Sequence, residues 1–417
     1  MFCTLKHLSL YLEMETLYLF NPENDMALAC GDPYYMAPAS ARRMAAELSA
    51  LPAWYAQQGG NVWLDSPERA KIIKKQFPMS LPVNWVSEFS PIYNKVCPWG
   101  WNPSLVHRLQ EAGFPATAYP SAERMTRIRQ LSGRQTAVQV LRNLRRGANV
   151  CPSNGLSDVS GQTQEFTPTV GEAFVLSSVE EVENFVIAYS RALLKAPWSG
   201  SGRGIRHTSG EFPSPLKGWV RHILTTQNEV IGEPFYDKLL DFAMEFFADD
   251  RGRVCFVGYS LFETDKRGVY KENILASDAD IEARIAVYIP IKTLRQVCDA
   301  LLVELTKMIK GEYEGYLGVD MMICHTSDGY TLHPCVEINF RMNMGVLARL
   351  IYDRYVCDGV QGRYVIEHYA APGEAWRSHL ALQEKNPLRM EDEKVKSGYL
   401  SLTPITEDTA YQAYIIL

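Results

Sequence analysis

Short apolar segments alternate with amphipathic segments from Thr16 onward. The apolar stretches at 16–20 and 61–64 predict strands, and the stretches near 40–49 and 67–76 have the polar and apolar spacing of helices. Strands that alternate with helices are typical of a parallel sheet covered by helices. The N-terminal third is therefore predicted to be a parallel α/β domain.

The middle of the chain continues this alternation. A basic segment at 124–146 predicts a helix, and the polar, glycine-rich stretch at 154–169 predicts a loop. Ser178 followed three residues later by Glu181 is a capping-box signature, so a helix begins there and leads into the apolar stretch before Lys195. This part is predicted to be a second, smaller α/β unit.

The last third predicts paired strands at 240–249 and 253–263, followed by a long amphipathic helix at 291–310. Residues 316–340 read as a β-hairpin with a turn in the middle. From about Pro372 the chain carries many charges and no pattern that indicates chemistry.

The hairpin carries two carboxylates within apolar flanks. If residues 327–328 form its tip, Asp320 lies opposite Cys335, and Glu337 and Asn339 share its face because side chains alternate along a strand. Asp320 and Glu337 are then diagonal neighbours, about 7–8 Å apart. Two carboxylates and an amide oxygen suit Mg²⁺. The alternative is a pair of solvated charges on an exposed face, but the apolar flanks favour the metal site.

The stretch LLKAPWSGSGRGI, residues 193–205, has the composition of a phosphate-binding loop but fits neither familiar type. A Walker loop places its lysine after the glycines and then begins a helix, whereas Lys195 precedes the glycines and a strand follows. A dinucleotide fingerprint also opens a helix. The pattern predicts a strand, a glycine-rich tip and a second strand, in which Lys195 and backbone N–H groups can bind phosphate. An ordinary hairpin turn is the alternative.

Composition narrows the class of protein. The chain has 417 residues, 47% hydrophobic and 22% charged, with a net charge of -6, so it is predicted to be globular with two or three domains. A mildly acidic chain indicates neither a nucleic-acid nor a membrane partner. No apolar run reaches the length of about 18 residues that a membrane helix needs. Residues 1–13 are predicted to be a dispensable extension.

Nine cysteines without a CxxC pair indicate free thiols in a reducing compartment, so a cytoplasmic location is predicted. One group has the residue types of a zinc site: Cys324, His325, His333 and Cys335. Pairing around the intervening turn would not bring all four side chains together, so a zinc site is the weaker alternative.

Residues 125–345 resemble the ATP-grasp superfamily. The resemblance rests on a strand that ends in a lysine, a glycine-rich hairpin, a connector that begins with a glutamate, and the strands that contain GVD and EIN, in this order. The resemblance implies an α+β ATP-grasp module behind a Rossmann-like domain. The implied parts are the extension 1–13, the Rossmann-like domain 14–123, the small subdomain 124–232 with its glycine-rich lid, the large subdomain 233–371 with the metal site, and the C-terminal extension 372–417.

The resemblance also assigns roles to residues. The implied ATP-binding residues are Arg134, Lys195, Ser199, Gly200, Ser201, Gly202, Glu233, Pro234, Phe235 and Asp241. Lys195 would bind the α- and β-phosphates, Glu233 begins the adenine-binding connector, and Asp241 would meet the ribose. Asp320, Glu337 and Asn339 match the ligands of Mg²⁺, which Mn²⁺ can replace. Lys195 and Arg341 are the implied catalytic residues, and a surface ion pair is the alternative role of Arg341.

The implied reaction joins a small carboxylic acid, such as an amino acid or a peptide, to an amine or thiol through an acylphosphate. The alternatives are a phosphotransferase of the same fold and a non-catalytic nucleotide-binding protein. Substrate contacts are expected from the turn at 21–25, from Trp99 and Trp101, and from the loop at 263–273, each of which is otherwise a polar turn or a solvated loop. The sequence predicts no oligomeric state.

Overall fold

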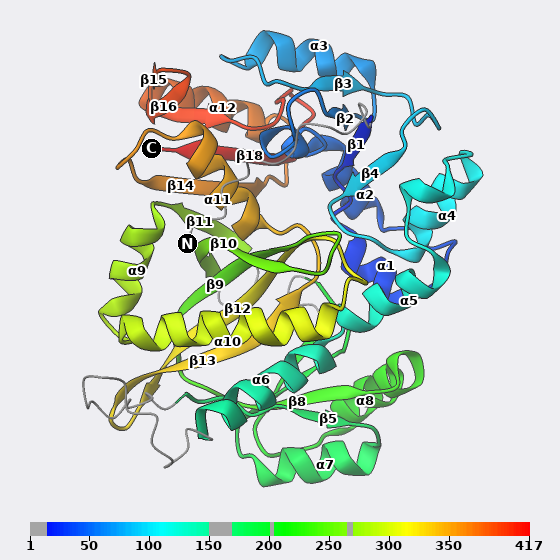
Figure 1. Cartoon of the computed structure of the whole chain (residues 1–417), viewed down its shortest axis with the longest axis vertical. Coiled ribbons are helices and arrows are strands. Elements are labelled where there is room, and N and C mark those ends of the chain that lie inside the picture. The colour runs from blue at the N-terminus through cyan, green and yellow to red at the C-terminus, as the bar shows by residue number, and fades with distance from the viewer. Residues whose placement is uncertain (1–14, 150–168, 201–203, 265–269) are drawn as a thin grey trace. The chain divides into compact units, whose positions relative to one another are not determined.

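The computed structural model describes residues 15–149, 169–200, 204–264 and 270–417, and of residues 147–149 only the backbone. The chain divides into two compact units (Figure 1). The first unit consists of Met1–Arg129, Ser260–Ser277 and Phe340–Leu417, and the second of Gln130–Tyr259 and Asp278–Asn339.

The first unit begins with a parallel sheet in the order β3-β2-β1-β4. Its strands are β1 (Thr16–Leu19), β2 (Asn61–Trp63), β3 (Asn84–Val86) and β4 (Lys95–Pro98). The accompanying helices are α1 (Asn24–Cys30), α2 (Ala39–Glu47), α3 (Pro67–Gln76), α4 (Pro103–Glu111) and α5 (Ala122–Leu131), with 3-10 helices η1 (Leu51–Trp54) and η2 (Ala116–Ala118). Leu17 of β1 and Leu109 of α4 lie in one buried cluster. The predicted parallel α/β arrangement is confirmed.

The rest of the first unit is built around four neighbouring antiparallel strands of an eight-stranded sheet, in the order β11-β14-β18-β17. The elements are β11 (Tyr270–Leu275), β14 (Gly362–His368), β17 (Tyr399–Ser401), β18 (Tyr411–Ile416), α11 (Met344–Tyr355), α12 (Glu374–Lys385) and the hairpin of β15 (Arg389–Glu391) and β16 (Lys394–Ser397). Tyr399 and Tyr414 pack with Val365 of β14. The charged segment after Pro372 is therefore built into this unit.

The second unit contains a small antiparallel sheet in the order β5-β8-β6-β7. Its elements are β5 (Phe174–Leu176), β6 (Ala192–Lys195), β7 (Ile205–Thr208), β8 (Val230–Pro234), α7 (Val179–Ala188) and α8 (Ser214–Gln227). Ser178 caps α7 as predicted, because its hydroxyl accepts from the N–H of Glu181 at 3.1 Å. Val182 of α7 and Val220 of α8 are fully buried on this sheet.

The second unit also contains four neighbouring strands of the eight-stranded sheet, in the order β13-β12-β9-β10. The elements of this part are β9 (Lys238–Ala248), β10 (Val254–Thr264), β12 (Gly315–Thr326), β13 (Gly329–Asn339), α6 (Arg134–Asn149), α9 (Asp278–Ala286) and α10 (Ile291–Ile309). β10 continues beyond Tyr259 into the first unit, where it pairs with β11. Helix α10 runs along the sheet, and α6 packs on both β13 and α10 (Figure 1). The hairpin tip is at residues 327–328, as predicted, because Thr326 pairs with Gly329.

The single helix predicted at 124–146 is wrong, because α5 ends at Leu131 and α6 begins at Arg134. Gly133 lies at the break, where a Cβ would be only 2.4 Å from the side chain of Gln135. Serine and glycine are poor residues for a helix interior, and the Ser132–Gly133 pair was the signal in the sequence. The break matters because it makes Arg134 the first residue of a new helix. In the described ranges no helix combines the length and apolarity required to cross a membrane.

Candidate active site

The register of the β12–β13 hairpin differs from the prediction. Asp320 pairs with Glu337, whereas the sequence predicted Cys335 as its partner. The difference arises between Asp320 and Met322: these residues are two positions apart on β12, but their partners Glu337 and His333 are four positions apart on β13.

The extra residues of β13 lie in a stretch that contains Pro334. Proline has no N–H to donate to a β-ladder and is therefore common at such irregularities. A shift of two residues is one full period of a strand, so the side chains keep their predicted faces. Asp320, Glu337 and Asn339 consequently share one face, as predicted, and the two carboxylates are direct cross-strand neighbours.

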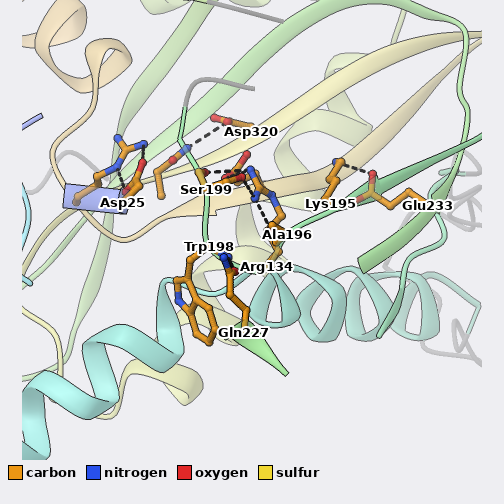
Figure 2. Close-up of polar contacts among 12 residues, drawn as sticks. Asp25, Arg134, Lys195, Ala196, Trp198, Ser199, Gln227, Glu233 and Asp320 are labelled. Atoms are coloured by element: carbon orange, nitrogen blue, oxygen red, sulfur yellow. Dashed lines mark hydrogen bonds and ion pairs between the residues drawn. The ribbon is translucent and has the colours of Figure 1, made fainter. Parts of the chain in front are cut away.

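Each of these carboxylates has a partner within the protein. Asn339 Nδ2 donates to Asp320 Oδ2 at 3.1 Å, and Glu337 Oε1 accepts from Arg134 Nη2 at 2.8 Å (Figure 2). Both carboxylates are half-buried rather than buried, and the Glu337 side chain is 30% exposed. The argument that burial alone requires a metal ion is therefore weaker than the sequence suggested, although all three residues present oxygen atoms on one face.

Arg134 connects this face to the glycine-rich loop. It is buried, and its guanidinium donates to the Ala196 carbonyl at 2.6 Å and to the Ser199 hydroxyl at 2.7 Å while it also holds Glu337 (Figure 2). Its Nε is buried without a partner among the described residues. One side chain thus brings the loop and the acidic strand to the same charged group.

The loop joins two antiparallel strands, as predicted, and does not open a helix. The N–H of Ala196 donates to the Gly204 carbonyl at 2.8 Å and closes the hairpin. The N–H of Trp198 donates to Gln227 Oε1 at 2.9 Å, which ties the loop to the end of α8 (Figure 2). Gly200 is the last described residue before the tip. The predicted tip residues outside the described ranges are Ser201 and Gly202.

Lys195 and Glu233 form a buried ion pair. Lys195 Nζ lies 2.6 Å from Glu233 Oε2, and the two residues are each 4% exposed (Figure 2). They come from the adjacent strands β6 and β8. Immediately after β8, the N–H of Phe235 donates to the Arg191 carbonyl at 3.0 Å, so this connector N–H is already used. Pro234, which has no N–H, pairs with Ala192 in the same sheet.

Asp241 occupies the same face of the large sheet as the acidic pair. It lies opposite Met322, which in turn lies opposite His333. Its carboxylate forms an ion pair with Lys238. The predicted ribose-binding residue is therefore one row of the sheet away from Asp320.

Arg341 belongs to the first unit, where it forms a bidentate ion pair with Asp25 at 2.9 and 2.8 Å. The neighbouring Asn21 has a structural role, because its amide donates to the Gly100 carbonyl at 2.8 Å and accepts from the Gly100 N–H at 3.2 Å. Trp99 is buried. Of the turn at 21–25, Asp25 thus meets the predicted catalytic arginine, while Asn21 holds the tryptophan-containing loop.

The loop at 263–273, from which substrate contacts were predicted, is described only in part. Lys271 lies 3.6 Å from Glu263 in an exposed ion pair, and residues 265–269 lie outside the described ranges. Among the residues that the structure describes, no three His, Cys, Asp or Glu side chains gather where they could hold a metal ion. The predicted Mg²⁺ ligands do not form such a group of three, because they are two carboxylates and the amide of Asn339.

No family model matches the sequence, and neither does any curated protein. Solved structures do match the fold. A biotin carboxylase from Campylobacter jejuni in a beta-gamma-ATP complex is 12% identical with a TM-score of 0.50, over 97% of this chain and 87% of that chain. The biotin carboxylase domain of a Hydrogenobacter thermophilus 2-oxoglutarate carboxylase, in complex with MgADP, ADP and bicarbonate, is 14% identical with a TM-score of 0.50, over 97% and 86%. N5-carboxyaminoimidazole synthetase from Staphylococcus aureus with ADP is 10% identical with a TM-score of 0.48, over 97% and 93%.

The chain has the ATP-grasp fold. The predicted fold class is confirmed by the two matches with the higher score, which at 12% and 14% identity show the fold alone. The second unit contains the small sheet with the glycine-rich loop and the strands with the β12–β13 hairpin. The division into a small subdomain 124–232 and a large subdomain 233–371 stays a prediction.

Two residues on the sheet face of Asp320 and Glu337 were not predicted from the sequence to lie there. Glu245 of β9 is 1% exposed and lies opposite Gly318, in the row that also contains Asn339. Its signal was the spacing of four residues from Asp241 along one strand, which places both on the same face. His333 was considered only as a zinc ligand, but it faces the same side as the acidic residues.

We expect Gly204→Ala to lower the free energy of unfolding by about 1–3 kcal/mol through overpacking of the loop base. A Cβ at this position would lie 2.3 Å from Oγ and 2.4 Å from Cβ of Ser199, so the backbone has to move. Urea denaturation measures the loss. Gly218→Ala in α8 is the matched control, because nothing lies within 4 Å of its Cβ and alanine favours a helix. Equal stability of the two variants would contradict the close packing of the loop.

Proposed function

We propose that the chain is an ATP-dependent ligase that joins a small carboxylic acid to an amine or a thiol. One observation carries the proposal: Arg134 binds the glycine-rich loop and Glu337 at the same time, beside Asp320. Groups suited to phosphate and groups suited to a divalent cation thus meet at one side chain. The fold supports the proposal, because the matched carboxylases are described in complexes with adenine nucleotides.

The residues present fit a magnesium–nucleotide complex. Lys195, Arg134 and the loop N–H groups supply positive charge and donors for phosphate oxygens. Asp320, Glu337 and Asn339 supply the hard oxygen atoms that Mg²⁺ or Mn²⁺ prefers. When bound, the cation would neutralise charge on the phosphates. Without the cation, Arg134 already supplies Glu337 with a positively charged partner.

The connector after β8 would hold the base and Asp241 the ribose. Glu233 is fixed by Lys195, and Pro234 and Phe235 are fixed by the backbone of β6 and Arg191. A rigid connector orders the site before the nucleotide arrives, which lowers the entropic cost of binding. Asp241 is the cross-strand neighbour of Met322, next to the acidic row.

In the proposed reaction a substrate carboxylate oxygen attacks the γ-phosphorus and ADP leaves, and the amine or thiol then attacks the acyl carbon and releases phosphate. Arg341 is the candidate for binding the substrate carboxylate or the transferred phosphoryl group, because guanidinium binds such oxygens in a bidentate manner. Asp25 now occupies both donor positions, so it would have to yield part of this ion pair.

The test is release of ADP from Mg-ATP in the presence of single amino acids and dipeptides, each with and without an added amine. A ligase requires both the acid and the acceptor for full turnover. No turnover with any pair, together with no change in melting temperature on addition of Mg-ATP, would overturn the proposal.

Hydroxylamine separates the main alternative. It traps an acylphosphate as a hydroxamate, so a ligase gives ADP and hydroxamate from acid and ATP, whereas a phosphotransferase that acts on a hydroxyl group gives ADP and a stable phosphate ester. A non-catalytic nucleotide-binding protein would show the melting-temperature shift without either product.

A further inference from the structure

The buried residue His333 has polar ring atoms that the described residues do not satisfy. It is 1% exposed, and both ring nitrogens lack a hydrogen-bond partner among the described residues. Burying a polar group without a partner costs free energy, so nearly all such groups in native proteins are paired with protein, water or ligand. His333 therefore marks a place where a partner beyond the described residues is expected.

The position of His333 follows from the sheet register. It lies opposite Met322, which lies opposite Asp241, and cross-strand partners share one face. The adjacent row contains Asp320 and Glu337. His333 is thus on the nucleotide-facing side of the sheet in the proposed site, one row from the residues assigned to the cation.

Two neighbours place the imidazole beside the connector. The ring of Tyr236, which directly follows the connector residue Phe235, meets the His333 ring edge-on with centroids 5.3 Å apart. Across the ring, a Cβ at Gly171 would lie 2.7 Å from Nε2, so only glycine leaves room there. The N–H of Val170 donates to the Leu332 carbonyl at 2.9 Å and holds this segment against β13.

Burial of His333 favours the neutral form of its imidazole. Burial lowers the pKa of His333 to about 3, and the positive charge of Lys195 acts in the same direction. A neutral imidazole offers one N–H donor and one acceptor nitrogen. These two groups can match an uncharged heterocycle that has both a donor and an acceptor on its edge.

We propose that His333 forms a hydrogen bond with the purine base of the bound nucleotide. The inference rests on the proposed nucleotide-dependent function. If the phosphates lie at the loop and at the Asp320 row, and the base lies along the connector, then His333 is at the base end of the site. An aminopurine presents an exocyclic amino donor and ring-nitrogen acceptors, either of which a neutral imidazole can match.

The test compares dissociation constants for Mg-ATP and two analogues on the full chain. Purine riboside triphosphate lacks the 6-amino group and 7-deaza-ATP lacks N7, while both keep the triphosphate. The wild-type protein is expected to bind one of the two about tenfold more weakly than ATP, the order of one buried hydrogen bond. In His333→Phe, ATP and that analogue are expected to bind equally.

Further variants keep the result clear. His333→Gln retains a donor and an acceptor and is expected to recover part of the discrimination. His325→Phe is the matched control, because His325 is exposed on the partner strand β12. This variant should leave the discrimination between ATP and the analogue unchanged. Discrimination that is absent in the wild-type protein, or that persists in His333→Phe, overturns the role of His333. A wild-type protein that binds neither Mg-ATP nor Mg-tripolyphosphate overturns the proposed function instead.

Discussion

Replacing Lys195 by methionine is expected to lower the free energy of unfolding by about 3–5 kcal/mol, the range found when one partner of a buried ion pair is removed. Both members of the pair are 4% exposed, so Glu233 would remain buried without a counter-charge. Urea denaturation followed by circular dichroism measures the change. We also expect the variant to lose binding of Mg-ATP, because Lys195 ends β6 directly before the glycine-rich loop and is a phosphate-binding residue in the proposed function.

The double variant Lys195→Met/Glu233→Gln separates the two effects. It removes both charges, so most of the lost stability should return, while nucleotide binding should stay weak. Lys217→Met is the matched control: its ion pair with Glu183 is 3.6 Å long and partly exposed, so the expected loss is below about 1 kcal/mol. A loss of stability no larger for Lys195→Met than for Lys217→Met would show that the buried pair contributes little.

The second unit shows which features the sequence carries locally. The strands around the glycine-rich loop, the capped helix α7 and the long helix α10 were all predicted, because periodicity and caps depend on residues a few positions apart. The glycine-rich loop was assigned to a hairpin from the order of its lysine and glycines alone. Such signals can be recognised without knowledge of the tertiary structure.

The partners of the charged residues could not be predicted in the same way. Arg134 and Glu337 are 203 positions apart, and no local spacing encodes their hydrogen bond. The same is true of Lys195 and Glu233, which meet only because β6 and β8 are neighbours in the sheet. The sequence identified the charged residues but not which charge neutralises which.

The hairpin register is an intermediate case. Its tip and the shared face of Asp320 and Glu337 were predicted, but their direct pairing was not, because regular pairing was assumed through Pro334. Proline within a strand was a visible sign of an irregular ladder. The shift happens to equal one strand period, which is why the functional prediction for this face did not depend on the error.

Glu337→Gln is expected to reduce Mg-dependent ADP release by about 100- to 1000-fold, comparable to the removal of one charge-stabilising group in other enzymes. Glutamine keeps the side-chain length and an oxygen that can still accept from Arg134, so the hydrogen bond of 2.8 Å between Arg134 and position 337 is retained in kind. Stability should change by less than about 1 kcal/mol, because the side chain is 30% exposed. Steady-state rates across a Mg²⁺ titration, with urea denaturation alongside, provide both measurements.

Two further variants decide how Glu337 acts. Glu183→Gln, at an exposed carboxylate of α7, is the matched control and should leave rates and Mg²⁺ dependence unchanged. Arg134→Met removes the guanidinium that contacts Glu337 but leaves the oxygen atoms of Asp320, Glu337 and Asn339. It should therefore raise the KM for ATP, while the required Mg²⁺ concentration stays similar. If Glu337→Gln also leaves the Mg²⁺ requirement unchanged, Glu337 serves to position Arg134 and the loop, and Asp320 must hold the cation without it.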